Sequence, residues 1–136
     1  METLQNLFLI MPSSWLVRIA VALLWLYEGV WCKVLDHEPR QAQAVGTVGA
    51  SEGTTKLLFK LLGWVELVIA LWVLSNVAPG LCAAVQTTLL VVLTSGALIF
   101  ARKVIHDPAG VVFKNIVFVT LIWVQPGLAG LGAIPR

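Results

Sequence analysis

The sequence predicts an all-α integral membrane protein, a bundle of four transmembrane helices. Hydrophobic residues make up 59% of its 136 residues, charged residues only 12%, and the mean hydropathy is +0.92. Soluble domains carry about 25% charged residues, and a chain this short leaves much of its surface exposed. An ordinary soluble domain is therefore excluded. Four apolar stretches each reach the length of about 20 residues that a helix needs to cross a bilayer.

The same composition excludes two other classes of protein. So apolar a chain is not intrinsically disordered. Nine Lys and Arg residues against seven Asp and Glu residues give a net charge of only +2, so the chain lacks the basic surface of a nucleic-acid-binding protein.

The four helices are predicted in order along a single domain, residues 1–136. Their expected ranges are about 14–35, 57–77, 81–102 and 110–131. Two of the connections are short and carry turn residues, Pro79-Gly80 in one and Asp107-Pro108 in the other. Tight turns of this kind favour antiparallel neighbouring helices.

The remaining connection, residues 36–55, is the one long polar segment. Asp36 followed by Pro39 resembles a helix start, which predicts a short helix lying at the membrane interface. A solvated loop and a flap over a pocket are the alternatives.

Basic residues predict the orientation in the membrane, because cytoplasmic loops carry an excess of Lys and Arg. Seven of them flank the first and third connections: Lys33, Arg40, Lys56, Lys60, Arg102, Lys103 and Lys114. Both of those connections are thus expected in the cytoplasm and both termini outside.

Charged residues inside the predicted helices are the candidates for a functional site, because an ionisable group at bilayer depth is costly. Depths estimated from the rise of about 1.5 Å per residue place five polar residues in one layer of the cytoplasmic half of the bilayer: Glu28, Lys60, Glu66, Lys114 and Asn115. Arg18 is a sixth candidate for the same site, although it falls toward the opposite face with Gln86 and Gln125. The cytoplasmic set predicts a polar pocket, and ion pairs that only hold helices in register are the alternative.

Trp25 and Trp64 lie deep in the predicted helices and are the expected apolar wall of that pocket. A flat apolar ligand such as a quinone suits such a wall, whereas packing between helices or against lipid is the simpler interpretation.

The cysteines and histidines limit the chemistry. Cys32 and Cys82 fall at opposite faces of the bilayer, too far apart for a disulfide, so thiol chemistry would need a partner. No catalytic signature is present, and whether the chain is an enzyme stays open. No metal site is predicted, because ordinary loop polarity accounts for the loop residues that could form one: Asp36, His37, Glu38, His106 and Asp107.

Three motifs resemble those of the DoxX-like membrane proteins. They are R-x6-W-L-Y-E-G-V-W-x-K at 18–33, L-G-W-V-E-L at 62–67 and K-N at 114–115. The resemblance implies a four-helix bundle in a bacterial-type plasma membrane. It also implies a link to thiosulfate:quinone oxidoreduction or membrane thiol chemistry, with a soluble oxidoreductase as partner. The family's recurring polar positions fall here on Arg18, Glu28, Lys33, Glu66, Lys114 and Asn115.

These observations lead to one expected function and two alternatives. The first is a DoxX-like membrane subunit with a polar intramembrane pocket, for which a quinone or a small sulfur compound is the candidate ligand. The alternatives are a non-enzymatic anchor or assembly subunit for a soluble partner, and a minimal transporter that would act as a homodimer.

Overall fold

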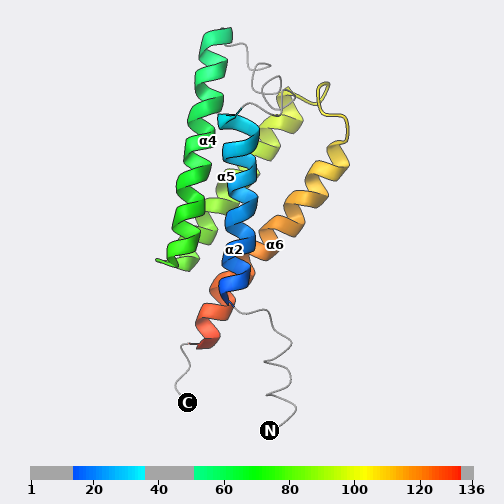
Figure 1. Ribbon diagram of the computed structural model, residues 1–136. Helices are drawn as coiled ribbons and strands as arrows, with labels where there is room; N and C mark the ends of the chain where they lie inside the picture. Colours follow the sequence, from blue (N-terminus) through cyan, green and yellow to red (C-terminus); the bar gives the residue numbers. More distant parts are fainter. Residues whose placement is uncertain (1–13, 36–50, 133–136) are drawn as a thin grey trace.

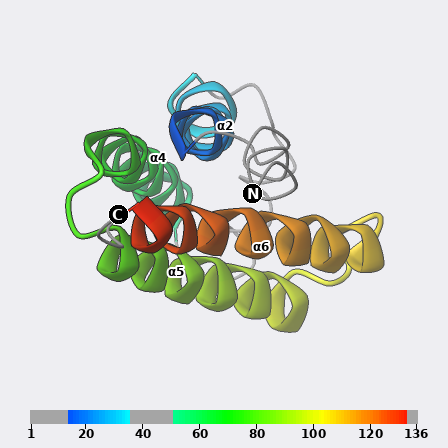
Figure 2. The same ribbon diagram turned by 90° about the horizontal axis from the view of Figure 1, so that it is seen from below.

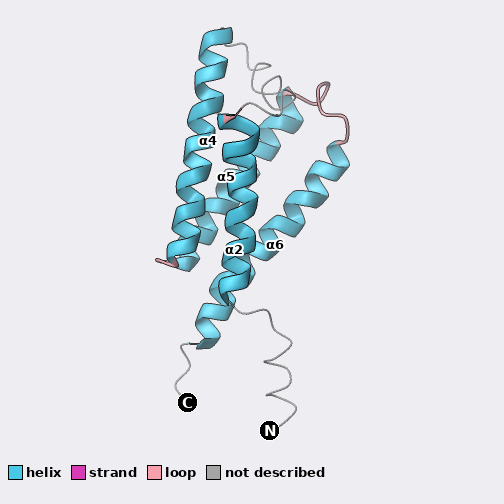
Figure 3. Ribbon diagram, in the orientation of Figure 1, coloured by secondary structure: helices cyan, strands magenta, loops and turns pink. Residues whose placement is uncertain are grey.

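The computed structural model describes residues 14–35 and 51–132, and the predicted all-α architecture is confirmed. The described chain contains four helices long and apolar enough to cross a membrane, and no strand (Figures 1 and 3). The first comprises α2 (Ser14–Leu26) and a continuing π-helix, η1 (Tyr27–Val34). The others are α4 (Glu52–Ser75), α5 (Pro79–Phe100) and α6 (Pro108–Gly132).

The start of α4 differs from the sequence prediction. Residues 52–55 were expected in the polar connection, but they form the first turn of the helix. Ser51 is the reason, because its Oγ accepts a hydrogen bond from the backbone N–H of Thr54 and so caps the helix. The rest of that connection, residues 36–50, lies outside the described residues, and so does the predicted interfacial helix.

The helices form two layers that cross each other. α2 and α4 are seen almost end-on in Figure 2, where α5 and α6 run side by side across the view. α6 lies between α2 and α5, and it packs against both of them. The first described residue of α2 and the last of α6 lie at the same end of the bundle as the α4–α5 turn (Figure 1).

The opposite end of the bundle carries most of the basic residues, and we call it the basic end. It comprises the end of η1, the start of α4 and the α5–α6 connection (Figure 1). Asp107 begins α6 there, because its Oδ1 accepts a hydrogen bond from the Gly110 N–H at 2.9 Å, and Pro108 fits the first turn.

The core lies where the two layers cross. Trp25 of α2 packs against Phe118 of α6 with ring centroids 5.2 Å apart, and Ile122 and Val73 are wholly buried beside them. Most other large apolar side chains point outward, as a protein surrounded by lipid requires. Ile99 is 71% exposed and Phe113 69% exposed. The chain is therefore a multi-pass integral membrane protein.

Candidate functional site: an intramembrane chain of ion pairs

Two glycines bring η1 and α4 into contact. A Cβ atom added to Gly29 would lie 2.8 Å from the carbonyl oxygen of Gly63, and one added to Gly63 would lie 2.8 Å from that of Gly29. Only glycine allows two backbones to approach so closely. The crossing places the next inward residue of α4, Glu66, directly against η1.

The π-helix determines which side chain of η1 meets Glu66. The Leu35 N–H donates to the carbonyl of Val30, five residues earlier, at 2.9 Å. The wider turn brings Lys33 over Glu28, also five residues earlier. Lys33 Nζ donates to the Glu28 carbonyl oxygen at 3.0 Å and to Glu66 Oε2 at 2.9 Å.

Four side chains from η1, α4 and α6 form a continuous chain of alternating charge. Lys114 Nζ donates to Glu28 Oε1 at 2.9 Å. Glu28 Oε2 lies 3.8 Å from Lys33 Nζ, which pairs with Glu66. Two ammonium groups and two carboxylates balance, as charges buried away from water require. We call Lys114, Glu28, Lys33 and Glu66 the ion-pair chain.

Burial increases along the ion-pair chain from its outer to its inner end. The side chain of Lys114 is 63% exposed, that of Glu28 20%, that of Lys33 7% and that of Glu66 2%. The inner ammonium also lies over the ring of Phe59, 6.0 Å from its centroid. The inner pair, Lys33 and Glu66, is thus enclosed by protein, whereas the outer pair, Lys114 and Glu28, is accessible from outside the bundle.

The structure brings together three of the residues predicted for the polar pocket, namely Glu28, Glu66 and Lys114. Lys60 and Trp64 differ from the expectation, because both are exposed. They lie four residues apart on one face of α4. The inward face of that helix carries Thr55, Phe59, Gly63, Glu66, Ile69, Ala70 and Val73.

Trp25 is buried, as a pocket wall would be, but it belongs to a second polar layer. Its Nε1 donates to Gln86 Oε1 at 2.7 Å, and Gln86 Nε2 donates to the thiol sulfur of Cys82 at 3.3 Å. Arg18, the sixth candidate for the pocket, is not part of the ion-pair chain; it lies nearer the α4–α5 turn, where Nη1 donates to the Leu74 carbonyl at 3.4 Å. Gln125 joins this layer by donating to Asn76 Oδ1 at 3.2 Å.

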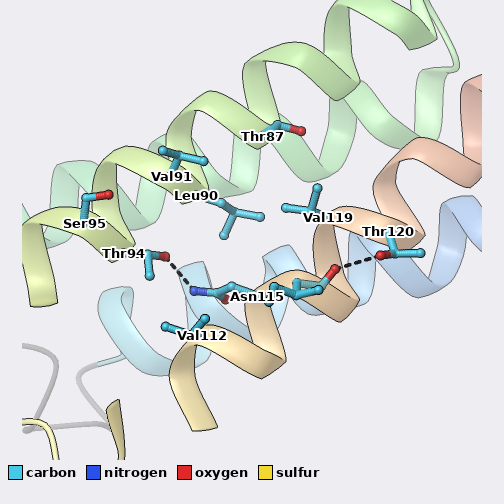
Figure 4. A pocket seen from close by; sticks show the side chains of 10 residues that line it. Thr87, Leu90, Val91, Thr94, Ser95, Val112, Asn115, Val119 and Thr120 are labelled. Atoms are coloured by element: carbon cyan, nitrogen blue, oxygen red, sulfur yellow. Dashed lines mark hydrogen bonds between the residues drawn. The ribbon is translucent and has the colours of Figure 1, made fainter. Parts of the chain in front are cut away.

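Asn115 follows Lys114 on α6 but faces α5 instead of the ion-pair chain. Its Nδ2 donates to Thr94 Oγ1 at 2.6 Å (Figure 4). Asn115 and Thr94 line a groove of about 340 Å³ between α5 and α6. The structure therefore separates the predicted layer into an ion-pair chain and a neutral groove.

The remaining candidates do not come together as a site. Cys32 and Cys82 are both buried, on η1 and α5 respectively, and they are not joined by a disulfide. His106 is exposed in the α5–α6 connection, and residues 36–38 lie outside the described residues. Within residues 14–35 and 51–132, no three His, Cys, Asp or Glu side chains are grouped to hold a metal ion.

Lys33 is the member of the site that helical spacing alone does not reveal. Five residues separate it from Glu28, and on an α-helix residues three or four apart share a face. A π-turn brings residues five apart together, and the sequence gives no direct signal of that turn. Family resemblance is the signal that did include this lysine.

Comparison with known proteins agrees with this architecture. A family model described as DoxX-like family matches residues 22–123, about three quarters of the chain. No curated protein and no solved structure matches this chain. The matched span includes Glu28, Lys33, Glu66 and Lys114, so the whole ion-pair chain lies within the family region. The chain belongs to the DoxX-like family.

Proposed function

We propose that this chain is a DoxX-like membrane subunit that binds a small redox-active ligand at the outer end of the ion-pair chain. A quinone headgroup or a small sulfur compound is the ligand class. The observation that carries the proposal is the gradient of burial from the exposed Lys114 to the enclosed Glu66. Charged residues at bilayer depth commonly mark ligand or proton pathways.

The outer pair supplies the chemistry of this proposal. Glu28 lies between two ammonium groups, at 2.9 Å from Lys114 Nζ and 3.8 Å from Lys33 Nζ. If Oε1 of Glu28 takes up a proton, Lys114 loses its ionic partner and becomes available to an oxygen atom of the ligand. Glu28 then holds a proton that it can exchange with that ligand.

The inner pair has a supporting role in the same proposal. Lys33 donates hydrogen bonds to Glu66 and to the Glu28 backbone carbonyl, so its ammonium group stays beside Glu28 when Lys114 leaves Glu28 for the ligand. This fixed ammonium group balances the charge of the Glu28 carboxylate when the proton has left.

Ligand binding by variants of the outer pair tests the proposal. A short-chain benzoquinone or thiosulfate is titrated into the purified protein in detergent, and binding is followed by calorimetry. Lys114→Gln should weaken binding of one of these probes at least about tenfold, because it removes a charge-assisted hydrogen bond to the ligand. Glu28→Gln has the shape of the protonated carboxyl group and frees Lys114, so it should bind that probe at least as tightly as the unchanged protein does. Lys103→Gln, an exposed change in the α5–α6 connection, is the matched control. Equal binding by all four proteins, or binding of neither probe, would contradict the proposal.

A second candidate function is an anchor or assembly subunit for a soluble oxidoreductase. One observation favours it: the charges of the ion-pair chain balance within the protein, as they would in a purely structural network. Lys56, Arg102 and Lys103 are exposed at the basic end, where an acidic partner would dock.

Co-purification from native membranes distinguishes the two functions. A stoichiometric soluble protein that is lost when Arg102 and Lys103 are changed to Gln supports the anchor. A bound small molecule that is lost in Lys114→Gln supports the ligand site.

A further inference from the structure

An open groove runs between α5 and α6 on the outer surface of the bundle. Its volume is about 340 Å³, at the small end of the range for ligand sites. Figure 4 shows hydroxyl and amide side chains along it among apolar ones. The polar residues are Thr87, Thr94, Ser95, Asn115 and Thr120.

The hydrogen-bonding capacity of these side chains is not equally used. Thr87 and Thr120 each donate the hydroxyl proton to a backbone carbonyl of their own helix, that of Ala83 at 2.8 Å and that of Ile116 at 2.9 Å. Thr94 makes no such bond; its Oγ1 accepts from Asn115 Nδ2. Among the described residues, the Thr94 hydroxyl proton and the Asn115 Oδ1 atom have no partner, nor has the exposed hydroxyl group of Ser95.

The Thr94 hydroxyl group and Asn115 Oδ1 both lie well inside the apolar helices. Thr94 is six residues from the end of α5, and Asn115 is seven from the start of α6, which places both about 10 Å inside the helix ends. A polar group left without a partner in hydrocarbon is costly. Asn115 Oδ1 is nevertheless accessible. Among the described residues, Arg18 Nε is the one side-chain nitrogen or oxygen atom that is both fully enclosed and without a hydrogen-bond partner, so the unpaired Asn115 Oδ1 is not enclosed.

We propose that this groove binds a lipid that carries a free hydroxyl group, such as a long-chain alcohol or a diacylglycerol. A hydroxyl group both accepts and donates, so it complements the spare donor of Thr94 and the spare acceptor of Asn115 together. Its hydrocarbon chain lies against Leu90, Val91 and Val119. The site shares no residue with the ion-pair chain, so it does not depend on the function proposed above.

Photo-crosslinking in vesicles tests this site. The protein is reconstituted in phosphatidylcholine vesicles with a diazirine-bearing hexadecanol or with its methyl ether, which cannot donate a hydrogen bond. After irradiation, mass spectrometry measures labelling of α5 and α6 peptides. The alcohol should label them about threefold or more above the ether, since the ether loses the bond to Asn115.

Two threonines of the groove provide a matched pair of variants. Thr94→Val removes the spare donor and should lower labelling by the alcohol about threefold or more. Thr120→Val keeps the same shape and removes a hydroxyl whose proton is already donated to Ile116, so labelling should persist. In Asn115→Leu, the alcohol and the ether should label equally.

Three results would overturn the proposal. The first is equal labelling of the unchanged protein by the alcohol and the ether, which decides the question even if a variant fails to fold. The second is an equal loss in Thr94→Val and Thr120→Val. The third is labelling of α5 and α6 by the alcohol that disappears as the ratio of protein to lipid in the vesicles is raised, which would identify the groove as a contact between protomers.

Discussion

Gly29 and Gly63 face each other across the contact between η1 and α4, each backbone carbonyl occupying the space that a Cβ on the other residue would need. The same contact places the Cβ of Glu66 2.9 Å from the Cβ position of Gly29. Lys33 and Glu66 can therefore meet only because these two positions lack side chains. The glycine crossing is the structural basis of the inner ion pair.

Replacement of either glycine should destabilise the bundle. Gly29→Ala and Gly63→Ala each force the two backbones apart, and such overpacking costs about 1–3 kcal/mol. Unfolding in detergent can be followed with a thiol-reactive dye, because Cys32 and Cys82 are both buried until the helices separate. Both variants should react at lower temperature than the unchanged protein.

Gly96→Ala in α5 is the control for this experiment. Nothing lies within 4 Å of the Cβ position of Gly96, and alanine favours a helix over glycine by up to about 1 kcal/mol. Its unfolding temperature should be unchanged or slightly higher. A loss as large as that of Gly29→Ala would show that the crossing is not what the first two variants disturb.

The inner ion pair should behave as a coupled unit. Glu66→Leu leaves the buried Lys33 ammonium without its nearest carboxylate, and removal of one partner of a buried pair costs about 3–5 kcal/mol. Lys33→Met together with Glu66→Leu removes both charges and should recover most of that stability. Unfolding of the single and double variants with the same thiol-reactive dye gives the coupling energy.

The exposed pair between Lys56 and Glu52 is the matched control, with a separation of 3.2 Å four residues apart on α4. Surface pairs of this kind contribute about 0.3–0.5 kcal/mol, so Lys56→Met should have little effect. If the double variant of Lys33 and Glu66 is no more stable than Glu66→Leu, the two charges are not coupled as the structure indicates.

The hydrogen bond between Trp25 and Gln86 should stabilise the crossing of the two layers. Gln86→Leu leaves a buried indole N–H without an acceptor, which costs about 1–3 kcal/mol. Trp25→Phe with Gln86→Leu removes both polar groups and should lose less than the sum of the single changes. Strictly additive losses in thermal unfolding would argue against the hydrogen bond.

The orientation predicted from the basic residues can be tested with a membrane-impermeant maleimide on intact cells. In a chain with Cys32 and Cys82 replaced by Ala, a cysteine at Val77 should react from outside, because the α4–α5 turn lies opposite the basic end. A cysteine at Lys103 should react only after the membrane is opened. The reverse pattern would show that the basic end faces outward.

The four helices could be predicted because apolar length is a strong signal in membrane proteins. The signal is weaker at helix ends, and the start of α4 shows why. Ser51, Glu52 and Thr54 are polar and read as part of a loop, yet the Ser51 cap makes them the first turn of the helix. A cap depends on one hydrogen bond, which hydropathy does not register.

The site could be predicted only in part, for a related reason. Glu28, Glu66 and Lys114 were found from depth in the bilayer, because a buried charge is conspicuous in an apolar helix. Depth does not say which way a side chain points around its helix, so Lys60 was included although it faces outward. Lys33 takes the place of the second ammonium through the π-turn of η1.

The different burial of the two ends of the ion-pair chain means that salt should act on them unequally. Mobile ions screen the partly exposed pair of Lys114 and Glu28, but they do not reach the enclosed pair of Lys33 and Glu66. Among the described residues, the outer pair is also the salt bridge that joins α6 to η1. Ionic strength at one membrane face would thus weaken the link between α6 and η1 while the contact between η1 and α4 stays intact.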